Sequence, residues 1–270
     1  MCKALNVSRS GLYAWLVRTE CKRSRENRDM TELIRNVFDD SRKIYGAPRV
    51  FRALRHRGVT CGRNRVARLM RAAGLRSKTK RKYRVKTTDS NHSLPIAPDL
   101  IERNFHAARA NETWVSDMTY IPTEEGWLYL AVTMDLFSRR IVGWSMAPTM
   151  HAKIVVDALQ MAIDQRSPAA DLVHHSDRGS QYASAVFRNL LNDHGLLASM
   201  SRKGNCYDNA AMESFFHSLK TELVSHEYYQ SHVAARASLF DYIEAFYNRE
   251  RLHSTLGYLS PNAFEKTSAA

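Results

Sequence analysis

The sequence lacks the features that mark membrane proteins, zinc proteins and two common enzyme classes. Its apolar runs fall short of the roughly 20 residues that cross a bilayer, and its N-terminus has no apolar stretch typical of a signal peptide. The four cysteines include no CxxC pair, which argues against structural zinc and for reduced thiols. No GxSxG or GxxxxGK[ST] motif occurs, so neither a serine hydrolase nor an ATP-binding P-loop is expected. We expect a cytoplasmic protein without a membrane segment.

Basic charge is concentrated in the first part of the chain. Residues 1–100 contain 25 Lys and Arg against 8 Asp and Glu, a net charge of +17, whereas residues 101–270 carry a net charge of −4. A strongly basic segment commonly contacts nucleic acid, so a DNA-binding arm joined to a second domain is predicted. A solvated basic surface without a partner is the alternative.

The segment LNVSRSGLYAWLVR, residues 5–18, has the pattern of the second half of a helix-turn-helix. Asn6 suits a left-handed turn position, and Ser8 or Ser10 can cap the helix that follows. Such signals are weak, and a generic amphipathic hairpin is an equal alternative.

A second helical pair is predicted from PRVFRALRHRG and RNRVARLMRAAG, which begin at Pro48 and Arg63. Pro48 suits a first helical turn, and Gly58 suits a C-terminal cap. Two short helices joined by a tight turn, with arginines on the second, fit helix-turn-helix geometry. The arginines expected to contact DNA are Arg63, Arg65 and Arg68.

Residues 76–98 are basic, then polar, then proline-bearing, with little periodicity, which indicates a domain boundary. The predicted organisation is a helical DNA-binding region over residues 1–75, a basic linker over 76–110 and a catalytic domain with C-terminal helices over 111–270. The linker residues expected to contact DNA are Lys80, Arg81 and Lys82.

The pattern changes to alternating strands and helices from residue 112 onward. Three strand candidates lie in TWVSDMTYIP, WLYLAVTMDLFS and RRIVGWSM. A helix over residues 152–166, a strand in LVHHS, a helix in SAVFRNLLNDHG and a fifth strand in LLASMS follow, and the chain from Asn209 to about Tyr247 is mostly helical. This order predicts an α/β fold with a mixed sheet.

Three carboxylates stand out against this background. Asp117 lies inside an otherwise β-forming strand, where a charge is costly unless it is paired or metal-bound. Asp177 follows the fourth strand, at an edge where α/β sheets bind ligands, and Glu213 lies on a helix. Such a set suits two Mg²⁺ ions that act in phosphoryl transfer. Asp135, at the end of the second strand, is the main rival for a ligand role.

The helix that carries Glu213 adds further candidates. Lys220 lies seven residues after Glu213 and Asn209 four residues before it, so all three share one face and the two neighbours are predicted DNA contacts. Glu222 points to the opposite side and is a poor candidate.

Two other polar groups are given structural roles. His174 and His175 are interpreted as strand-end residues, one inward and one outward, because a magnesium site does not need them. In the tail YNRERLHSTLGYLSP a packing role is preferred, and a DNA-facing role for Arg249 and Arg251 is the alternative.

The spacing of the acids carries a resemblance: 59 residues separate Asp117 from Asp177, and 35 separate Asp177 from Glu213. This resembles the DDE pattern of retroviral integrases and related transposases. The chain also resembles the OrfB subunit of the third insertion-sequence family over nearly its whole length. The segments that carry this likeness are WVSDMTYI, HHSDRGSQYAS, SRKGNCYDNAAMESFFHSLKTE, YNRERLHSTLGYLSP, YGAPRVFRALRHRGV and RNRVARLMRAAGL.

The resemblance implies a ribonuclease-H-like catalytic domain behind a helical, helix-turn-helix-like basic region. It implies that Asp117, Asp177 and Glu213 hold two Mg²⁺ ions, with Mn²⁺ as a substitute, and that Lys220 contacts DNA. The family cleaves at element 3′ ends and transfers the freed 3′-hydroxyl to target DNA without a covalent enzyme intermediate. An OrfA partner or fusion, a homo-oligomeric synaptic complex and a place with the nucleoid of a bacterial cytoplasm follow from the same resemblance. The alternatives are a DNA-binding regulator with an inactive integrase-like domain and a ribonuclease-H-like nuclease.

Overall fold

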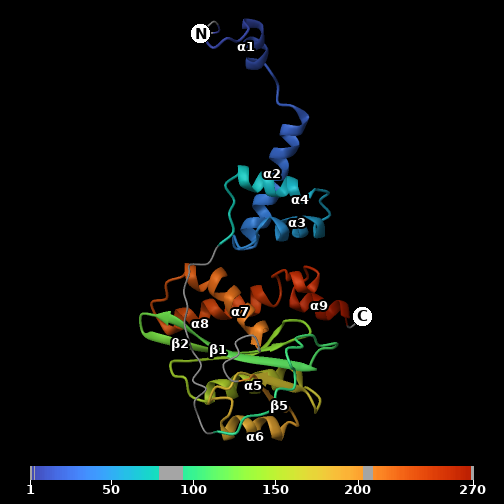
Figure 1. Cartoon of the computed structure of the whole chain (residues 1–270). Coiled ribbons are helices and arrows are strands. Elements are labelled where there is room, and N and C mark those ends of the chain that lie inside the picture. The colour runs from blue at the N-terminus through green and yellow to red at the C-terminus, as the bar shows by residue number, and fades with distance from the viewer. Residues whose placement is uncertain (1, 3, 79–93, 203–208, 269–270) are drawn as a thin grey trace. The chain divides into compact units, whose positions relative to one another are not determined.

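A computed structural model describes residues 2, 4–78, 94–202 and 209–268 of the chain. The chain divides into two units, Met1–Lys78 and Thr79–Ala270 (Figure 1). The described part of the first unit is helical. Its helices are α1 (Arg9–Leu16), α2 (Lys22–Asp40), α3 (Ala47–His56) and α4 (Arg63–Ala72).

Helix α1 forms as its local sequence predicts. Asn6 adopts a positive φ of 50°, and the Ser8 Oγ caps the helix by accepting a hydrogen bond from the Gly11 N–H at 3.0 Å. None of its residues is buried, and Trp15 is 68% exposed. Local capping, rather than packing, therefore accounts for this helix.

Helices α2, α3 and α4 pack against one another through their apolar faces. Helices α3 and α4 confirm the predicted pair: Pro48 lies in the first turn of α3, and Gly58 after it has a φ of 78°. The 19-residue helix α2 was not predicted. The buried side chains of this small core include Ile34, Phe38, Val50, Leu54 and Val66.

The second unit contains a five-stranded mixed sheet in the order β3-β2-β1-β4-β5, which confirms the predicted fold class. Strands β1 to β3 are antiparallel, whereas β4 runs parallel to β1 and β5 parallel to β4. The pairing of β4 with β1 ends at Val115 and His175. The strands are β1 (Thr113–Thr123), β2 (Gly126–Asp135), β3 (Ile141–Ala147), β4 (Val173–Ser176) and β5 (Leu197–Met200).

Helices cover both faces of this sheet (Figure 1). Helix α5 (Lys153–Arg166) packs on β2 and β3, and α6 (Ala185–Asp193) packs on β5. On the other face, α7 (Ala210–Glu222) and α8 (His232–Phe240) contact β1. Four shorter elements complete the unit: η2 (Val224–His226), the π-helical η3 (Asp241–Tyr247), η4 (Ser254–Leu256) and α9 (Pro261–Ser268).

The described residues before β1 pack on the sheet rather than standing apart from it. The Leu100 N–H donates to the Ser199 Oγ at 2.9 Å, and the Met200 N–H donates to the Pro98 carbonyl at 3.2 Å. Ile101 is buried. The predicted linker over 76–110 therefore belongs to the second unit from residue 94 onward. In the described parts of the chain, no helix has the length and apolarity that spanning a membrane requires.

Candidate active site

Asp117 and Asp177 lie together where β4 separates from β1. Asp117 comes two residues after the last paired residue of β1, and Asp177 directly follows β4. Both are half-buried and line one narrow cavity of about 10 Å³, roughly the space of one water. Tyr120, Gln181 and Tyr182 line it as well. The fold therefore brings these two predicted acids to one place.

Backbone N–H groups orient both carboxylates. Asp117 Oδ1 accepts a hydrogen bond from the Met118 N–H at 2.7 Å, and Asp177 Oδ1 accepts one from the Gly179 N–H at 2.9 Å. A Cβ on residue 179 would lie only 3.0 Å from Asp177 Oδ1, so glycine lets the turn close around the carboxylate. Asp117 is thus oriented by the strand that carries it, and Asp177 by the turn that follows β4.

The electrostatics of Asp117 place helix α7 at the same site. Burial raises the pKa of Asp117 well above its usual range, and the charges of Asp177 and Glu213 raise it further, while Lys220 lowers it. The charges of Glu213 and Lys220, seven residues apart on α7, therefore both act on Asp117. Their roles as metal ligand and DNA contact stay predictions.

The positions along α7 differ in exposure. Glu213 is exposed in the first turn, whereas Lys220 is half-buried with its Nζ 5.2 Å from the centre of the Tyr120 ring. Asn209 is only 6% exposed and donates from Nδ2 to the Ser116 carbonyl at 3.1 Å. The predicted DNA contact does not fit Asn209, because its side chain is buried between the start of α7 and β1.

The chemistry of this group suits a hard cation. Carboxylate oxygens are the ligands that Mg²⁺ prefers, and a cation between Asp117 and Asp177 would relieve the repulsion that raises the pKa of Asp117. Among the described residues, no three His, Cys, Asp or Glu side chains have the spacing of a metal site. The two aspartates fit the cation, and the ligand role of Glu213 stays a prediction.

Asp135 has a structural role, which removes it as a rival metal ligand. It is fully buried and accepts hydrogen bonds from the N–H groups of Asn111 at 2.8 Å and Phe137 at 2.9 Å. Arg166 forms an ion pair with it at 3.2 Å. These partners tie the end of β2 to helix α5.

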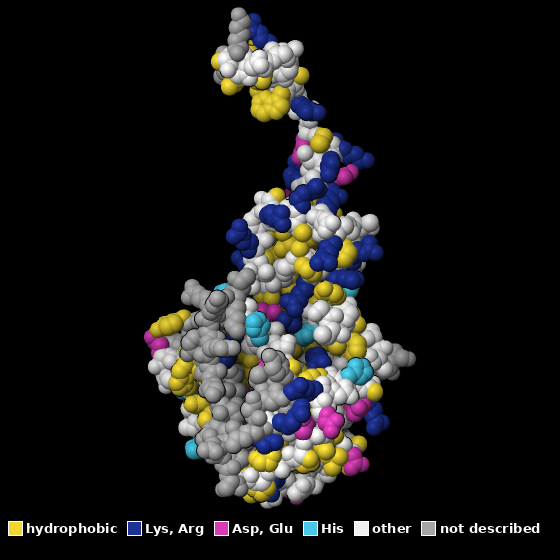
Figure 2. All heavy atoms as spheres, in the orientation of Figure 1, with side chains coloured by type: hydrophobic (Ala, Val, Ile, Leu, Met, Phe, Trp, Pro, Cys, Tyr) yellow, Lys and Arg dark blue, Asp and Glu magenta, His cyan; other side chains and the backbone are white. Residues whose placement is uncertain are grey.

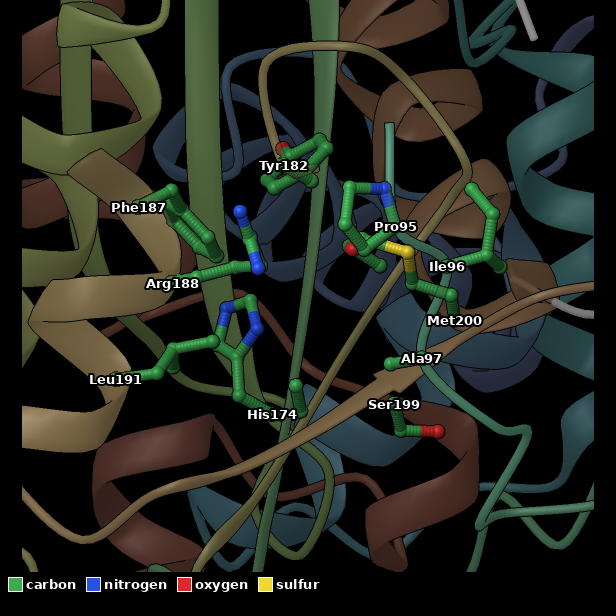
Figure 3. Close-up of a pocket in the computed structure, with 12 residues that line it drawn as sticks. Pro95, Ile96, Ala97, His174, Tyr182, Phe187, Arg188, Leu191, Ser199 and Met200 are labelled. Carbon is green, nitrogen blue, oxygen red and sulfur yellow. The ribbon is translucent and has the colours of Figure 1, made fainter. Parts of the chain in front are cut away.

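The expectation of one inward and one outward histidine is wrong. His174 and His175 are both buried: His174 packs on Phe187 of α6, and His175 contacts Ser199, which the segment before β1 covers. His174 Nε2 lies 2.8 Å from the Ser116 Oγ, and His175 Nδ1 lies 2.8 Å from the Ser199 Oγ. His174 lines a cavity of about 150 Å³ together with Phe187 (Figure 3). Their exclusion as metal ligands stays a prediction.

The arginines of α4 lie on a basic surface of the first unit. Arg63 and Arg68 are exposed, whereas Arg65 is half-buried and donates from Nε to the Asn27 Oδ1 at 3.0 Å. Figure 2 shows Lys and Arg side chains over much of the visible face of this unit. An open hollow of about 450 Å³ is lined by Lys22, Arg23, Glu26, Arg65 and Arg68. The predicted contacts Lys80, Arg81 and Lys82 lie outside the described residues.

Several residues of the carboxylate cavity are not predicted from the sequence. Gln181 and Tyr182 both line it and belong to the segment HHSDRGSQYAS. Their proximity to Asp177 in sequence was the available signal. Their orientation depends on the turn at Gly179, which a linear pattern does not specify.

Comparison with known proteins assigns both units. An HTH-like domain matches residues 24–83, and two models described as integrase core domain match residues 107–206 and 213–268. Transposase InsF for insertion sequence IS3A of Escherichia coli strain K12 is 44% identical over all of this chain and 94% of its own length. This chain belongs to the IS3-family transposases.

A second curated protein and one solved structure are also similar to this chain. The uncharacterized 31 kDa protein of insertion element IS600 from Shigella sonnei is 44% identical to this IS3-family chain over 98% of the chain and 97% of its own length. A chain of the simian T-cell lymphotropic virus intasome in complex with the PP2A regulatory subunit B56 gamma has a TM-score of 0.50 at 16% identity, covering 79% of this chain and 69% of the viral one. That likeness concerns the fold, which is ribonuclease-H-like as predicted.

Proposed function

We propose that this IS3-family chain is the catalytic subunit of a DNA transposase that cleaves at the 3′ ends of an insertion element and transfers the freed 3′-hydroxyl to target DNA. The observation that carries the proposal is the meeting of Asp117 and Asp177 in one cavity with Glu213 and Lys220 close enough to act on Asp117. An integrase core domain with acids in this arrangement suits phosphoryl transfer on DNA.

Asp117, Asp177 and Glu213 would hold two Mg²⁺ ions, with Mn²⁺ as a substitute. When bound, such ions activate a water or 3′-hydroxyl nucleophile and stabilise the leaving oxygen. The backbone N–H groups of Met118 and Gly179 keep the two aspartates oriented for this task. Lys220 extends from the same face of α7 and would contact a DNA phosphate beside the carboxylates.

The first unit would hold the element DNA. Its HTH-like domain and exposed Arg63 and Arg68 supply positive charge for phosphate contacts, which position DNA without reading its sequence. The linker residues Lys80, Arg81 and Lys82 are proposed to extend this surface. An OrfA partner or fusion, a homo-oligomeric synaptic complex and a place with the bacterial nucleoid remain parts of the proposal.

The decisive experiment compares Asp177→Asn with the wild-type chain on DNA that carries the element ends. With Mg²⁺, the wild-type protein should give cleaved ends and 3′-hydroxyl joining products, and Asp177→Asn should give neither while keeping DNA affinity within a few-fold. Asp193→Asn, an exposed residue at the end of α6, is the matched control. DNA binding without any Mg²⁺-dependent product would favour the regulator, and cleavage without joining would favour the nuclease.

A further inference from the structure

Tyr182 places a buried hydroxyl beside the two aspartates. The residue is 2% exposed and lines the same cavity as Asp117 and Asp177. Among the described residues its hydroxyl has no hydrogen-bond partner, although the oxygen is shielded from solvent. A buried hydroxyl without a partner is uncommon in folded proteins, and a bound ion or ligand is one of its ordinary explanations.

Backbone hydrogen bonds and ring packing together hold the Tyr182 side chain in position. The turn after Asp177 closes through hydrogen bonds from the Tyr182 N–H to the Gly179 carbonyl at 3.0 Å and from the Ala183 N–H to the same oxygen at 3.2 Å. The ring packs edge-on against Phe187 with centroids 5.3 Å apart, and Phe187 packs in the same way on His174 (Figure 3). The hydroxyl is therefore held in place without any hydrogen bond of its own.

The surroundings make this hydroxyl a donor. Burial, together with the negative charges of Asp117 and Asp177, raises the pKa of Tyr182 well above its usual range, so the phenol keeps its proton. The carboxylates of Asp117 and Asp177, which line the same cavity, are anionic acceptors. Groups that hydrogen-bond to metal-ligating carboxylates orient them and strengthen metal binding.

We propose that the Tyr182 hydroxyl is a positioning group for the cation site: it donates a hydrogen bond into the oxygen ligands of a divalent cation held by Asp117 and Asp177. The inference rests on the proposed function, because it assumes that these aspartates hold a cation. The inference adds Tyr182 to the three acids of the proposed site. The Tyr182 hydroxyl then has a hydrogen-bond partner only when the cation is bound.

Removal of the Tyr182 hydroxyl should therefore stabilise the metal-free chain and weaken its binding of a divalent cation. In the metal-free chain with EDTA, Tyr182→Phe should raise the thermal midpoint, by roughly 2–4 °C, because a buried group without a partner is removed. In Mn²⁺ titrations followed by electron paramagnetic resonance, the same variant should bind about 10-fold more weakly or worse. The Mg²⁺ concentration for half-maximal DNA cleavage should rise in proportion, and excess Mg²⁺ should restore the rate.

Tyr229→Phe is the matched control. Tyr229 is also buried, at 4% exposure, but its hydroxyl lies 3.2 Å from the Ser238 Oγ. Its loss should lower the thermal midpoint and leave Mn²⁺ binding unchanged. A purely structural Tyr182 would behave in the same way, and that result would overturn the inference.

Asp177→Asn in the same titration separates the inference from the function on which it rests. If the wild-type chain binds Mn²⁺ and Asp177→Asn does not, the cation site stands and Tyr182→Phe decides the inference alone. If Asp177→Asn binds Mn²⁺ like the wild type, or if neither protein binds it, the cation site and the inference fall together.

Discussion

Arg251 forms a bidentate ion pair with Glu222 inside the helical layer of the second unit. Arg251 Nε lies 2.7 Å from Glu222 Oε2 and Nη2 lies 2.6 Å from Oε1, and the two residues are 4% and 6% exposed. The Tyr242 hydroxyl donates to the same carboxylate at 2.7 Å. The packing role preferred for the tail is therefore confirmed for Arg251, and Glu222 faces a partner away from the acidic site.

Arg251→Ala should destabilise the protein strongly. The substitution leaves the Glu222 carboxylate buried without its cation, and breaking a buried pair from one side typically costs about 3–5 kcal/mol. Arg249→Ala, at an exposed position two residues away, should change the free energy of unfolding by less than about 0.5 kcal/mol. Urea unfolding measures both, and similar losses would contradict the assigned role.

Gly143→Ala should separate strand β3 from helix α5. A Cβ at this position would lie 2.1 Å from the Ala158 carbonyl oxygen and 2.8 Å from the Ala162 Cβ, closer than side chains tolerate. Because the contact is with helix backbone, a rotamer change cannot relieve it. We expect a loss of about 3 kcal/mol or more in the free energy of unfolding. Wild-type stability would show that α5 can shift away from the sheet at little cost.

Strong local patterns made much of the fold predictable. The β-forming segments around Asp117 and the capped helices after Pro48 and Arg63 appear where the sequence places them. Helix α2 was missed, although its buried residues Met30, Ile34, Val37 and Phe38 recur at helical spacing. This apolar spacing is hard to discern because charged residues surround it in the sequence.

Tertiary packing explains most of the remaining differences. Asp135 could not be excluded as a ligand from sequence, because its partner Arg166 lies 31 residues away on another element. The burial of Asn209 depends on where α7 begins relative to β1. The burial of His175 depends on Ser199 and the segment before β1. In each case the deciding neighbour is distant in sequence.

His174 should make the folded state sensitive to acid. Burial, with His175 beside it, lowers the pKa of His174 to about 3, from 6.5. The unfolded chain binds this proton below pH 6.5 and the folded chain does not, so the stability that His174 contributes is complete above that pH and is lost as the pH falls toward 3.

His174→Gln should therefore flatten the pH dependence of stability, because the variant has no imidazole that takes up a proton on unfolding. Between pH 6 and 4 the slope of the unfolding free energy should fall by up to about 1.4 kcal/mol per pH unit. His217→Gln, on the exposed face of α7, is the control. Parallel curves for wild type and His174→Gln would contradict the buried neutral histidine.

Arg68→Ala should weaken DNA binding by the first unit without changing sequence preference. Arg68 is exposed and lines the basic hollow with Lys22, Arg23 and Arg65, where a phosphate would displace counterions. Loss of one phosphate contact should reduce the slope of log K against log salt by about 1 and weaken binding evenly across DNA sequences. Fluorescence anisotropy of the full chain at several salt concentrations measures both quantities.

Arg28→Ala tests whether this effect belongs to the hollow or to net charge alone. Arg28 is also exposed, but its guanidinium already pairs with Glu20 at 2.8 Å, so fewer counterions are released when DNA binds near it. Its substitution should leave the salt slope close to that of the wild type. If Arg28→Ala and Arg68→Ala reduce the slope equally, diffuse charge holds the DNA; if only Arg68→Ala does so, the hollow between α2 and α4 is the phosphate site.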